Sequence, residues 1–217
     1  STLLPEYAYN AELNLNKQLG GKIKIDLTGY YTLLDRAMVL RSSTLNGQNQ
    51  LIYDGELSNV FSLQNAAFAK IKGIHVGMEI ALSKYMLLTS RYNWQKGLEE
   101  LDDKTTSPSR HAAPAFGLTK IRYQSKKVSL ELSSQYSAAM PFEKMPQEEI
   151  TKQTIYAADS NGNPYSPSWL IFNLSTRYDL SPHFQINAGI ENIGNLQYRG
   201  YSSGIVNPGR NFQLSIK

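Results

Sequence analysis

The sequence predicts an all-β protein that forms part of an antiparallel up-and-down transmembrane β-barrel. Apolar and polar residues alternate with a period of two along most of the 217 residues, which indicates strands with one apolar and one polar face. The alternating runs are about ten residues long, roughly twice the usual strand of a soluble domain. Short and long connections strictly alternate, so that all the tight turns fall at one end of the sheet.

The first four expected strands have the clearest alternation. Residues 7–16 alternate tyrosine, alanine and leucine with glutamate and asparagine, and Gly20-Gly21 then predict a tight turn, because glycine accepts positive φ angles. Residues 23–33, 73–82 and 88–95 repeat the pattern. A tilted strand of this length is long enough to cross the hydrocarbon of a bilayer.

Five more strands are expected in the second half of the chain. Residues 114–123 are irregular, because Phe116 and Leu118 share one parity whereas Ile121 and Tyr123 share the other. This break predicts a β-bulge or a register shift. The alternation then returns in the runs 128–136, 170–178, 184–191 and 211–216. The sequence therefore predicts about nine strands and no helix.

The connections and the polar faces favour a membrane barrel over a packed core. Bacterial outer-membrane barrels have short periplasmic turns and long extracellular loops. Charges in the middle of a strand are costly in a dry core and cheap beside a wet lumen. Tyrosine and tryptophan near strand ends are typical of membrane interfaces. The expected turns are 20–21, 83–86, 124–127 and 179–183, and the loops are 41–58, 97–113, 138–167 and 195–208. The mid-strand charges are Glu12, Asp26, Glu79, Arg91, Glu131, Arg177 and Glu191, and the interface aromatics are Tyr7, Tyr31, Trp94, Tyr136 and Tyr178.

The composition excludes several classes of protein. The net charge of +4 is spread along the chain without a basic run, so nucleic-acid binding is not expected. There is no cysteine, which excludes a disulfide framework and thiolate-bound metal. No stretch approaches the roughly 20 apolar residues of a membrane helix. The first residue is Ser1 and no apolar leader follows, so we expect a mature product or a fragment.

Several motifs, in a consistent order, carry a family resemblance. Glu191-Asn192-Ile193-Gly194-Asn195-Leu196-Gln197-Tyr198 follows the eighth expected strand, and Pro208-Gly209-Arg210-Asn211-Phe212 opens the ninth. This arrangement resembles the C-terminus of TonB-dependent outer-membrane receptors. Three upstream segments are also similar to that family: Leu4-Pro5-Glu6-Tyr7, Ala69-Lys70-Ile71-Lys72-Gly73-Ile74 and Ser109-Arg110-His111.

The resemblance implies a specific place for this chain in a larger receptor. The family barrel has 22 strands and an N-terminal plug, so residues 1–217 would be the C-terminal portion of the barrel, with about the last nine strands and no plug domain. An open sheet would leave unpaired edges in lipid, so the chain should pair with more barrel. Family members usually end on an aromatic residue, whereas this sequence ends at Lys217.

The resemblance also implies a function, a location and partners. It places the chain in the bacterial outer membrane, as part of a receptor for active uptake of a ferric chelate, haem, cobalamin, a glycan or a peptide. The implied partners are the remaining barrel strands and plug of the same receptor, and, through the plug, the periplasmic energy-transducing protein and its inner-membrane complex. Outer-membrane lipid, lipopolysaccharide and a surface lipoprotein are the other candidate partners.

Two alternatives belong to other classes of protein. A secreted soluble β-sandwich that binds carbohydrate would also show alternation. An outer-membrane barrel enzyme would need a Ser-His-acid set, and none is apparent beside His75. We expect no catalytic residue, cofactor or metal, because His75, His111 and His183 lie far apart. The Asp159–Asn163 segment fits a turn better than a calcium loop, and the acidic run 99–103 fits a solvated loop.

Ligand contacts are expected where the polar face meets the long loops. Arginine and aromatic side chains dominate recognition surfaces, which selects Arg91, Trp94, Tyr156, Arg199 and Tyr201. Trp94 is better explained as an interface anchor. Ordinary loop packing is likewise the better explanation of Tyr156, Arg199 and Tyr201.

Overall fold

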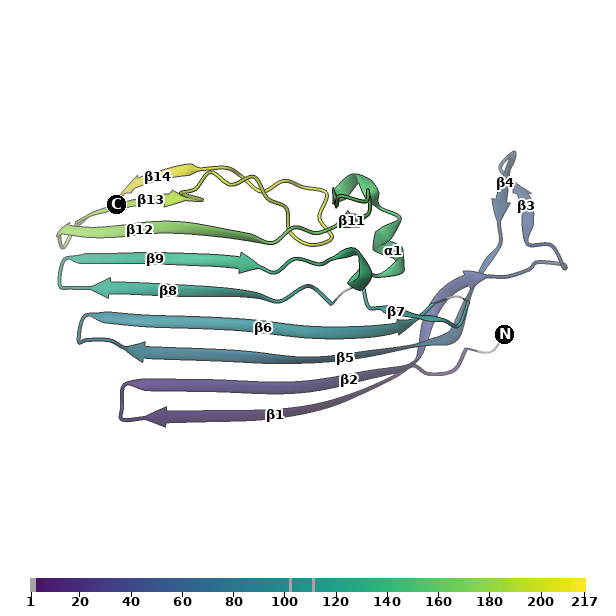
Figure 1. Ribbon diagram of the computed structural model, residues 1–217, viewed down its shortest axis with the longest axis horizontal. Helices are drawn as coiled ribbons and strands as arrows, with labels where there is room; N and C mark the ends of the chain where they lie inside the picture. Colours follow the sequence, from purple (N-terminus) through teal and green to yellow (C-terminus); the bar gives the residue numbers. More distant parts are fainter. Residues whose placement is uncertain (1–2, 102, 111) are drawn as a thin grey trace.

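The computed structural model describes residues 3–101, 103–110 and 112–217, and within them nine long strands form one continuous antiparallel sheet. The strands lie side by side in chain order, apart from the small elements between them (Figure 1). Their bounds are β1 (Tyr7–Leu19), β2 (Ile23–Ser42), β5 (Phe61–Ala81), β6 (Met86–Glu100), β8 (Phe116–Gln124), β9 (Val128–Ser137), β12 (Trp169–Ser181), β13 (Phe184–Glu191) and β14 (Asn211–Ile216).

The smaller elements all lie in the long connections. The β3–β4 hairpin projects beyond the sheet, and β7 pairs with β6 (Figure 1). The connection between β9 and β12 contains three short helical turns, which the sequence pattern did not predict, and one small hairpin. Among the described residues, no helix is long and apolar enough to cross a membrane. The elements are β3 (Gln50–Tyr53), β4 (Glu56–Asn59), β7 (Thr106–Pro108), η1 (Phe142–Lys144), α1 (Gln147–Ile150), η2 (Gln153–Ile155), β10 (Ala157–Ala158) and β11 (Pro164–Tyr165).

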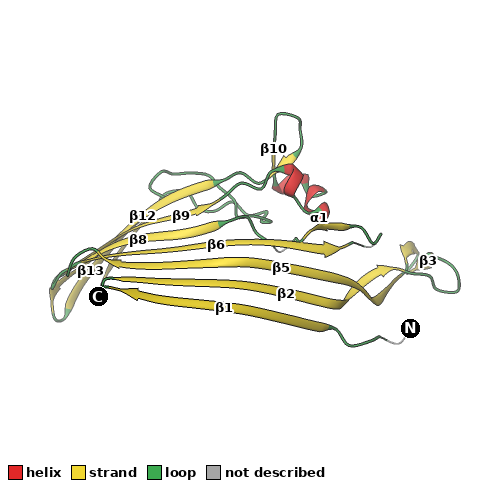
Figure 2. Cartoon of the chain, turned by 60° about the horizontal axis from the view of Figure 1, so that its bottom comes forward, coloured by secondary structure: helices red, strands yellow, loops and turns green. Residues whose placement is uncertain are grey.

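The tight turns and the long loops lie at opposite ends of the sheet, as predicted (Figures 1 and 2). The first tight turn is built on Gly20 and Gly21, whose φ angles are +55° and +67°. Both glycines therefore occupy the left-handed region, which side chains disfavour. The C-terminus lies at the end with the tight turns, and the N-terminal segment at the end with the long loops (Figure 2).

The sheet has an apolar face that nothing covers within the described ranges. Leu13 is 76% exposed and Leu214 is 73% exposed, although both belong to the apolar parity of their strands. The buried apolar residues are few and mostly small: Ala37, Ala67, Ala112, Met145 and Ile171. A β-sandwich would pack this face on a second sheet. The uncovered apolar face instead fits a barrel wall whose outer surface contacts lipid.

Both edges of the sheet are open in the described part of the chain. β1 pairs only with β2, and β14 pairs only with β13. Every residue of both edge strands is exposed. Unpaired backbone groups are not tolerated in hydrocarbon, so these edges require further strands.

The irregular fifth strand does not contain the bulge or register shift that the sequence predicted. β8 pairs continuously with β6 and with β9. The alternation breaks for another reason. Phe116 and Leu118 lie on the inner face together with Lys120, whereas Gly117 and Thr119 occupy the outer face. The sequence therefore suggested a bulge only because two apolar side chains lie on the lumen side of a regularly paired strand.

The second and third expected strands are about twice as long as the alternation indicated. β2 has 20 residues and β5 has 21 residues. Their pairing shifts register between Leu34 and Ala37, next to Arg36, whose φ angle is +56°. A bulge of this kind interrupts the period of two, so the alternation did not extend the expected strands into residues 34–42 of β2 and 61–72 of β5.

Candidate functional site

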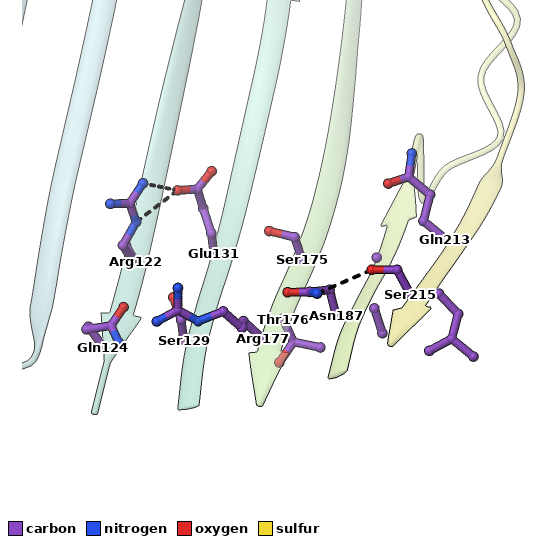
Figure 3. A pocket seen from close by; sticks show the side chains of 13 residues that line it. Arg122, Gln124, Ser129, Glu131, Ser175, Thr176, Arg177, Asn187, Gln213 and Ser215 are labelled. Atoms are coloured by element: carbon purple, nitrogen blue, oxygen red, sulfur yellow. Dashed lines mark hydrogen bonds and ion pairs between the residues drawn. The ribbon is translucent and has the colours of Figure 1, made fainter. Parts of the chain in front are cut away.

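The inner face near the tight turns is a polar wall (Figure 3). Glu131 accepts hydrogen bonds from Lys120 Nζ at 2.8 Å and from Arg122 Nη2 at 2.7 Å. Further along the wall, Asn187 Nδ2 donates to Ser215 Oγ at 3.2 Å. These groups surround a hollow of about 460 Å³, in which Arg122, Glu131, Asn187 and Ser215 all take part. Paired charges and amides suit a water-filled lumen.

At the other end, a long loop folds over the inner face. Gly97 lies on the inner parity of β6, and a Cβ atom at this position would lie 2.5 Å from Ser109 Cβ and 3.2 Å from Ala112 Cβ. The glycine is therefore needed for the close approach of the loop to the strand. The loop thus lies against the inner side of β6.

A buried carboxylate joins the long loops to one another. The side chain of Glu149, in α1, is fully buried. It accepts hydrogen bonds from Lys152 Nζ at 2.7 Å and from the hydroxyl of Tyr156, and Ser202 of the last loop also donates to it. Arg110 Nε of the β6–β8 loop lies 4.0 Å from its Oε1. We call Glu149, Lys152, Tyr156, Ser202 and Arg110 the loop clasp.

The loop clasp keeps Glu149 ionised. Burial alone would raise the pKa of this carboxyl, but the hydrogen bonds from Lys152, Tyr156 and Ser202 outweigh it and hold the pKa below its usual value. Burial, the hydrogen bond to Glu149 and the charge of this carboxylate raise the pKa of Tyr156. The tyrosine thus remains a hydrogen-bond donor at neutral pH.

Four of the five expected ligand contacts gather at the loop clasp, of which Tyr156 is itself a member. Arg91 and Tyr201 line one hollow of about 510 Å³, and Tyr156 and Arg199 line a second of about 530 Å³. Trp169 lines both hollows, which are therefore adjacent. Most of the lining of these hollows is apolar and aromatic, with a few polar groups, as is usual for small-molecule sites.

The loop residues of this group have different packing. The Nη1 of Arg199 donates to the backbone carbonyls of Thr154 and Ile155 at 3.4 and 3.3 Å, which ties the last loop to η2. The Tyr201 hydroxyl is buried and has no hydrogen-bond partner among the described residues. Burial and the Glu149 charge raise the pKa of Tyr201 to about 12, so its hydroxyl remains protonated.

Trp94 does not join the other four. It pairs with Ile74 across the strands and lies on the outer, apolar face, whereas Arg91 lies on the inner face of the same strand. It is 37% exposed there. This position agrees with the interface-anchor explanation.

Comparison with known proteins identifies the family. Residues 1–193 match the family described as "TonB dependent receptor-like, beta-barrel". The chain belongs to this family. TonB-dependent receptors reside in the bacterial outer membrane and are transporters, not enzymes.

Solved structures of siderophore receptors and of an iron transporter share the fold. The siderophore receptor PirA from Acinetobacter baumannii has a TM-score of 0.71 at 15% identity, and the match covers 99% of this chain and 32% of that one. The ferric enterobactin receptor PfeA from Pseudomonas aeruginosa (G324V mutant) has a TM-score of 0.70 at 15% identity, with 97% and 31% covered. The FrpB iron transporter from Neisseria meningitidis has a TM-score of 0.69 at 13% identity, and the match covers 97% of this chain and 31% of that one. The chain thus spans about a third of these barrel proteins.

The connection between β13 and β14 is organised around Asn192. This residue is 3% exposed and has a φ angle of +48°. Its Nδ2 donates to the carbonyls of Leu196 and Pro208, and its Oδ1 accepts from the Leu196 amide at 2.9 Å. Arg210 Nε donates to the Ile193 carbonyl at 2.9 Å. The two motifs of the family resemblance therefore bind each other and direct the chain into β14.

The remaining sequence candidates have structural explanations in this receptor barrel. Asp159 Oδ1 accepts from the amides of Asn161 and Asn163, both at 2.8 Å, which confirms the turn. The acidic run 99–103 is less solvated than expected. Glu100 pairs with Arg41 at 3.3 Å, and Asp102 lies outside the described residues.

The histidines do not form a metal site within the part of the chain that the structure describes. His75 packs edge-on against the Tyr30 ring on the inner face, with ring centroids 5.1 Å apart. His183 lies in the tight turn between β12 and β13. His111 is outside the described residues.

Proposed function

We propose that the chain is the C-terminal portion of the barrel of a TonB-dependent receptor, comprising the last nine of 22 strands. The receptor takes up a scarce nutrient, and this chain supplies part of the lumen wall and four long extracellular loops. The observation that carries the proposal is that three of these loops, those between β6 and β8, β9 and β12, and β13 and β14, meet over the inner face at one end of the sheet. The loops form hollows at the mouth of the lumen, where an incoming ligand first meets the barrel.

Arg91, Tyr156, Arg199 and Tyr201 are the residues that we propose to contact this ligand. Arg91 and Tyr201 are the best placed, because Arg91 is not in an ion pair among the described residues and the Tyr201 hydroxyl lacks a partner there. The pair offers a charged donor and a neutral donor to one hollow. Ligand oxygens, carboxylates or catecholates would satisfy both groups.

The ligand classes are a ferric chelate, haem, cobalamin, a glycan or a peptide. Ferric chelates come first, because solved structures with this fold include a ferric-catecholate import receptor and siderophore receptors. The proposal further requires the remaining strands, the plug and the periplasmic energy-transducing protein with its inner-membrane complex.

Uptake by the full-length receptor in cells tests the proposal. Cells are supplied with a labelled ferric catecholate, ferric hydroxamate, haem, cobalamin, oligosaccharide or peptide, with and without the energy-transducing protein. We expect energy-dependent uptake of one of these classes. Absence of energy-dependent uptake of every class, glycans and peptides included, would contradict the proposed function.

Variants of the same receptor test the site. For the ligand that is taken up, Arg91→Ala should weaken binding about 30-fold, as for a central recognition residue. Tyr201→Phe should weaken binding about fivefold without loss of stability, because it removes a hydroxyl that lacks a partner in the protein. Tyr92→Phe, one residue away on the outer face, is the control and should leave binding unchanged. Equal effects of all three substitutions would refute the site.

A further inference from the structure

Three lysines form a cluster on the outer face of the sheet. Lys72 of β5 lies directly opposite Lys96 of β6. Lys70 is the next residue of β5 on the same face, toward the long loops, and it lies between Leu33 of β2 and Leu98 of β6. Lys70 and Lys72 point to the same face of β5 as Ile74 and the other apolar residues of that strand, and Lys96 points to the same face of β6 as Trp94. All three therefore lie on the face that contacts the membrane. We call Lys70, Lys72 and Lys96 the lysine row.

The lysine row has no carboxylate partner among the described residues. None of the ion pairs there includes Lys70, Lys72 or Lys96. All three are exposed, and Lys70 Nζ lies 4.9 Å from the centre of the Phe68 ring. Like charges directly opposite each other destabilise a sheet. By contrast, several charges of the inner face are paired across strands, as in Lys120 with Glu131 and Lys24 with Glu79.

The position of the lysine row matches one boundary of the membrane. The row follows directly after the pair of Ile74 and Trp94, an apolar and an aromatic residue of the outer face. From Leu82 at the tight turn to Lys72 the strand advances about ten residues, or roughly 33 Å. At a tilt of about 40° this is roughly 25 Å of height, which equals the apolar band of an outer-membrane barrel. The row is at the end with the long loops, and hence at the outer leaflet.

We propose that the lysine row binds the phosphate groups of an anionic lipid in the outer leaflet. The acyl chains would lie on the apolar residues below the row, and the aromatic ring of Trp94 would lie at the level of the headgroup. Two ammonium groups held side by side suit a headgroup with more than one phosphate. A bound phosphate would also relieve the repulsion between Lys72 and Lys96. The inference does not depend on the ligand that the receptor transports.

Native mass spectrometry of the full-length receptor in a neutral detergent tests the inference, with diphosphorylated lipid A as the probe. Each lysine at a membrane surface contributes about fivefold to the binding of an anionic lipid. Lys72→Gln with Lys96→Gln should therefore weaken binding about 25-fold. Lys17→Gln is the matched control, because Lys17 is also exposed on the outer face but lies near a tight turn. It should change binding less than twofold.

The other arms separate phosphate recognition from other causes. Lipid A without phosphates should bind the unaltered receptor about as weakly as the double variant binds the phosphorylated lipid. Inorganic phosphate at 10 mM should not displace the lipid. The double Lys→Arg variant should retain binding, and the double Gln variant should melt no lower than the unaltered receptor in lipid-free detergent, because a repulsion is removed.

Three results would overturn the inference. The first is undiminished binding by the double Gln variant, or an equal loss in Lys17→Gln. The second is equal binding of dephosphorylated lipid A, which would show that the acyl chains alone hold the lipid. The third is displacement by inorganic phosphate, which would assign the row to free phosphate.

Discussion

Replacement of Glu149 by alanine should release the extracellular loops while leaving the sheet intact. The carboxylate is fully buried, and it accepts hydrogen bonds from Lys152 at 2.7 Å, from Tyr156 and from Ser202. A hydrogen bond to a charged group contributes about 1.5–3 kcal/mol, and loss of one partner of a buried ionic group costs about 3–5 kcal/mol. Because Lys152 is partly exposed and water can reach it, we take the lower end, about 3 kcal/mol. This corresponds to roughly a 100-fold increase in local opening.

Native-state hydrogen exchange of the full-length receptor measures this opening. Amides in residues 138–167 should exchange about 100-fold faster in Glu149→Ala, whereas amides of β9 and β12 should be unchanged. Glu148→Ala is the matched control, because Glu148 is half exposed and, among the described residues, has a single ion pair, to Arg110 at 2.8 Å. An exposed pair contributes at most about 1 kcal/mol, so exchange should rise no more than about fivefold. If the two variants behave alike, the loop clasp does not hold the loops together.

Three further predictions concern the pH dependence of the loop clasp, the close approach at Gly97 and the hydrogen bonds of Asn192. The pKa of Glu149 is lowered in the folded loops, so its contribution to loop stability is present above the unfolded pKa of about 4.3 and is lost as the pH falls through the lower folded pKa. Hydrogen exchange of residues 138–167 should therefore accelerate only below about pH 4. Acceleration between pH 5 and 8 would contradict this. Gly97→Val places methyl groups where Ser109 packs and should destabilise the packing of the β6–β8 loop by about 1–3 kcal/mol. The loop, residues 101–115, should then be cleaved faster by a protease. Resistance to proteolysis equal to that of the wild type would refute the close approach. Asn192→Ala removes three hydrogen bonds from a buried site and should lower the stability of the β13–β14 end by about 2–3 kcal/mol in urea unfolding, an effect that Asn161→Ala in the exposed turn should not reproduce.

Most of the sheet could be predicted from the sequence because a barrel strand keeps one face in lipid and the other in water. The alternation of Phe172 and Leu174 with Asn173 and Ser175 reflects that environment. The predictions failed where the environment changed within one strand. Phe116 and Leu118 face the mouth of the lumen, beneath the loops, and a bulge beside Arg36 shifts the parity of β2.

The candidate site was predictable only in part. Arginine and tyrosine at the junction of the inner face and the loops were sufficient to select Arg91 and Tyr201. The central residue, Glu149, was missed, because a glutamate in a polar loop ordinarily lies in water, and its partners Arg110 and Ser202 belong to loops far away in sequence. The Gly97 contact had no signal either, since an isolated glycine in a strand has several explanations. Contacts between loops depend on tertiary structure that no local pattern records.

The central claim is that this chain is one part of an outer-membrane barrel whose other strands complete it. Its most direct test is the mass of the intact particle extracted with detergent from the outer-membrane fraction of cells that express the receptor. We predict a particle that contains the strands described above together with further barrel strands, which close on the edges β1 and β14. Recovery of the 24.4 kDa chain by itself, as a compact monomer in the soluble fraction, would contradict the account.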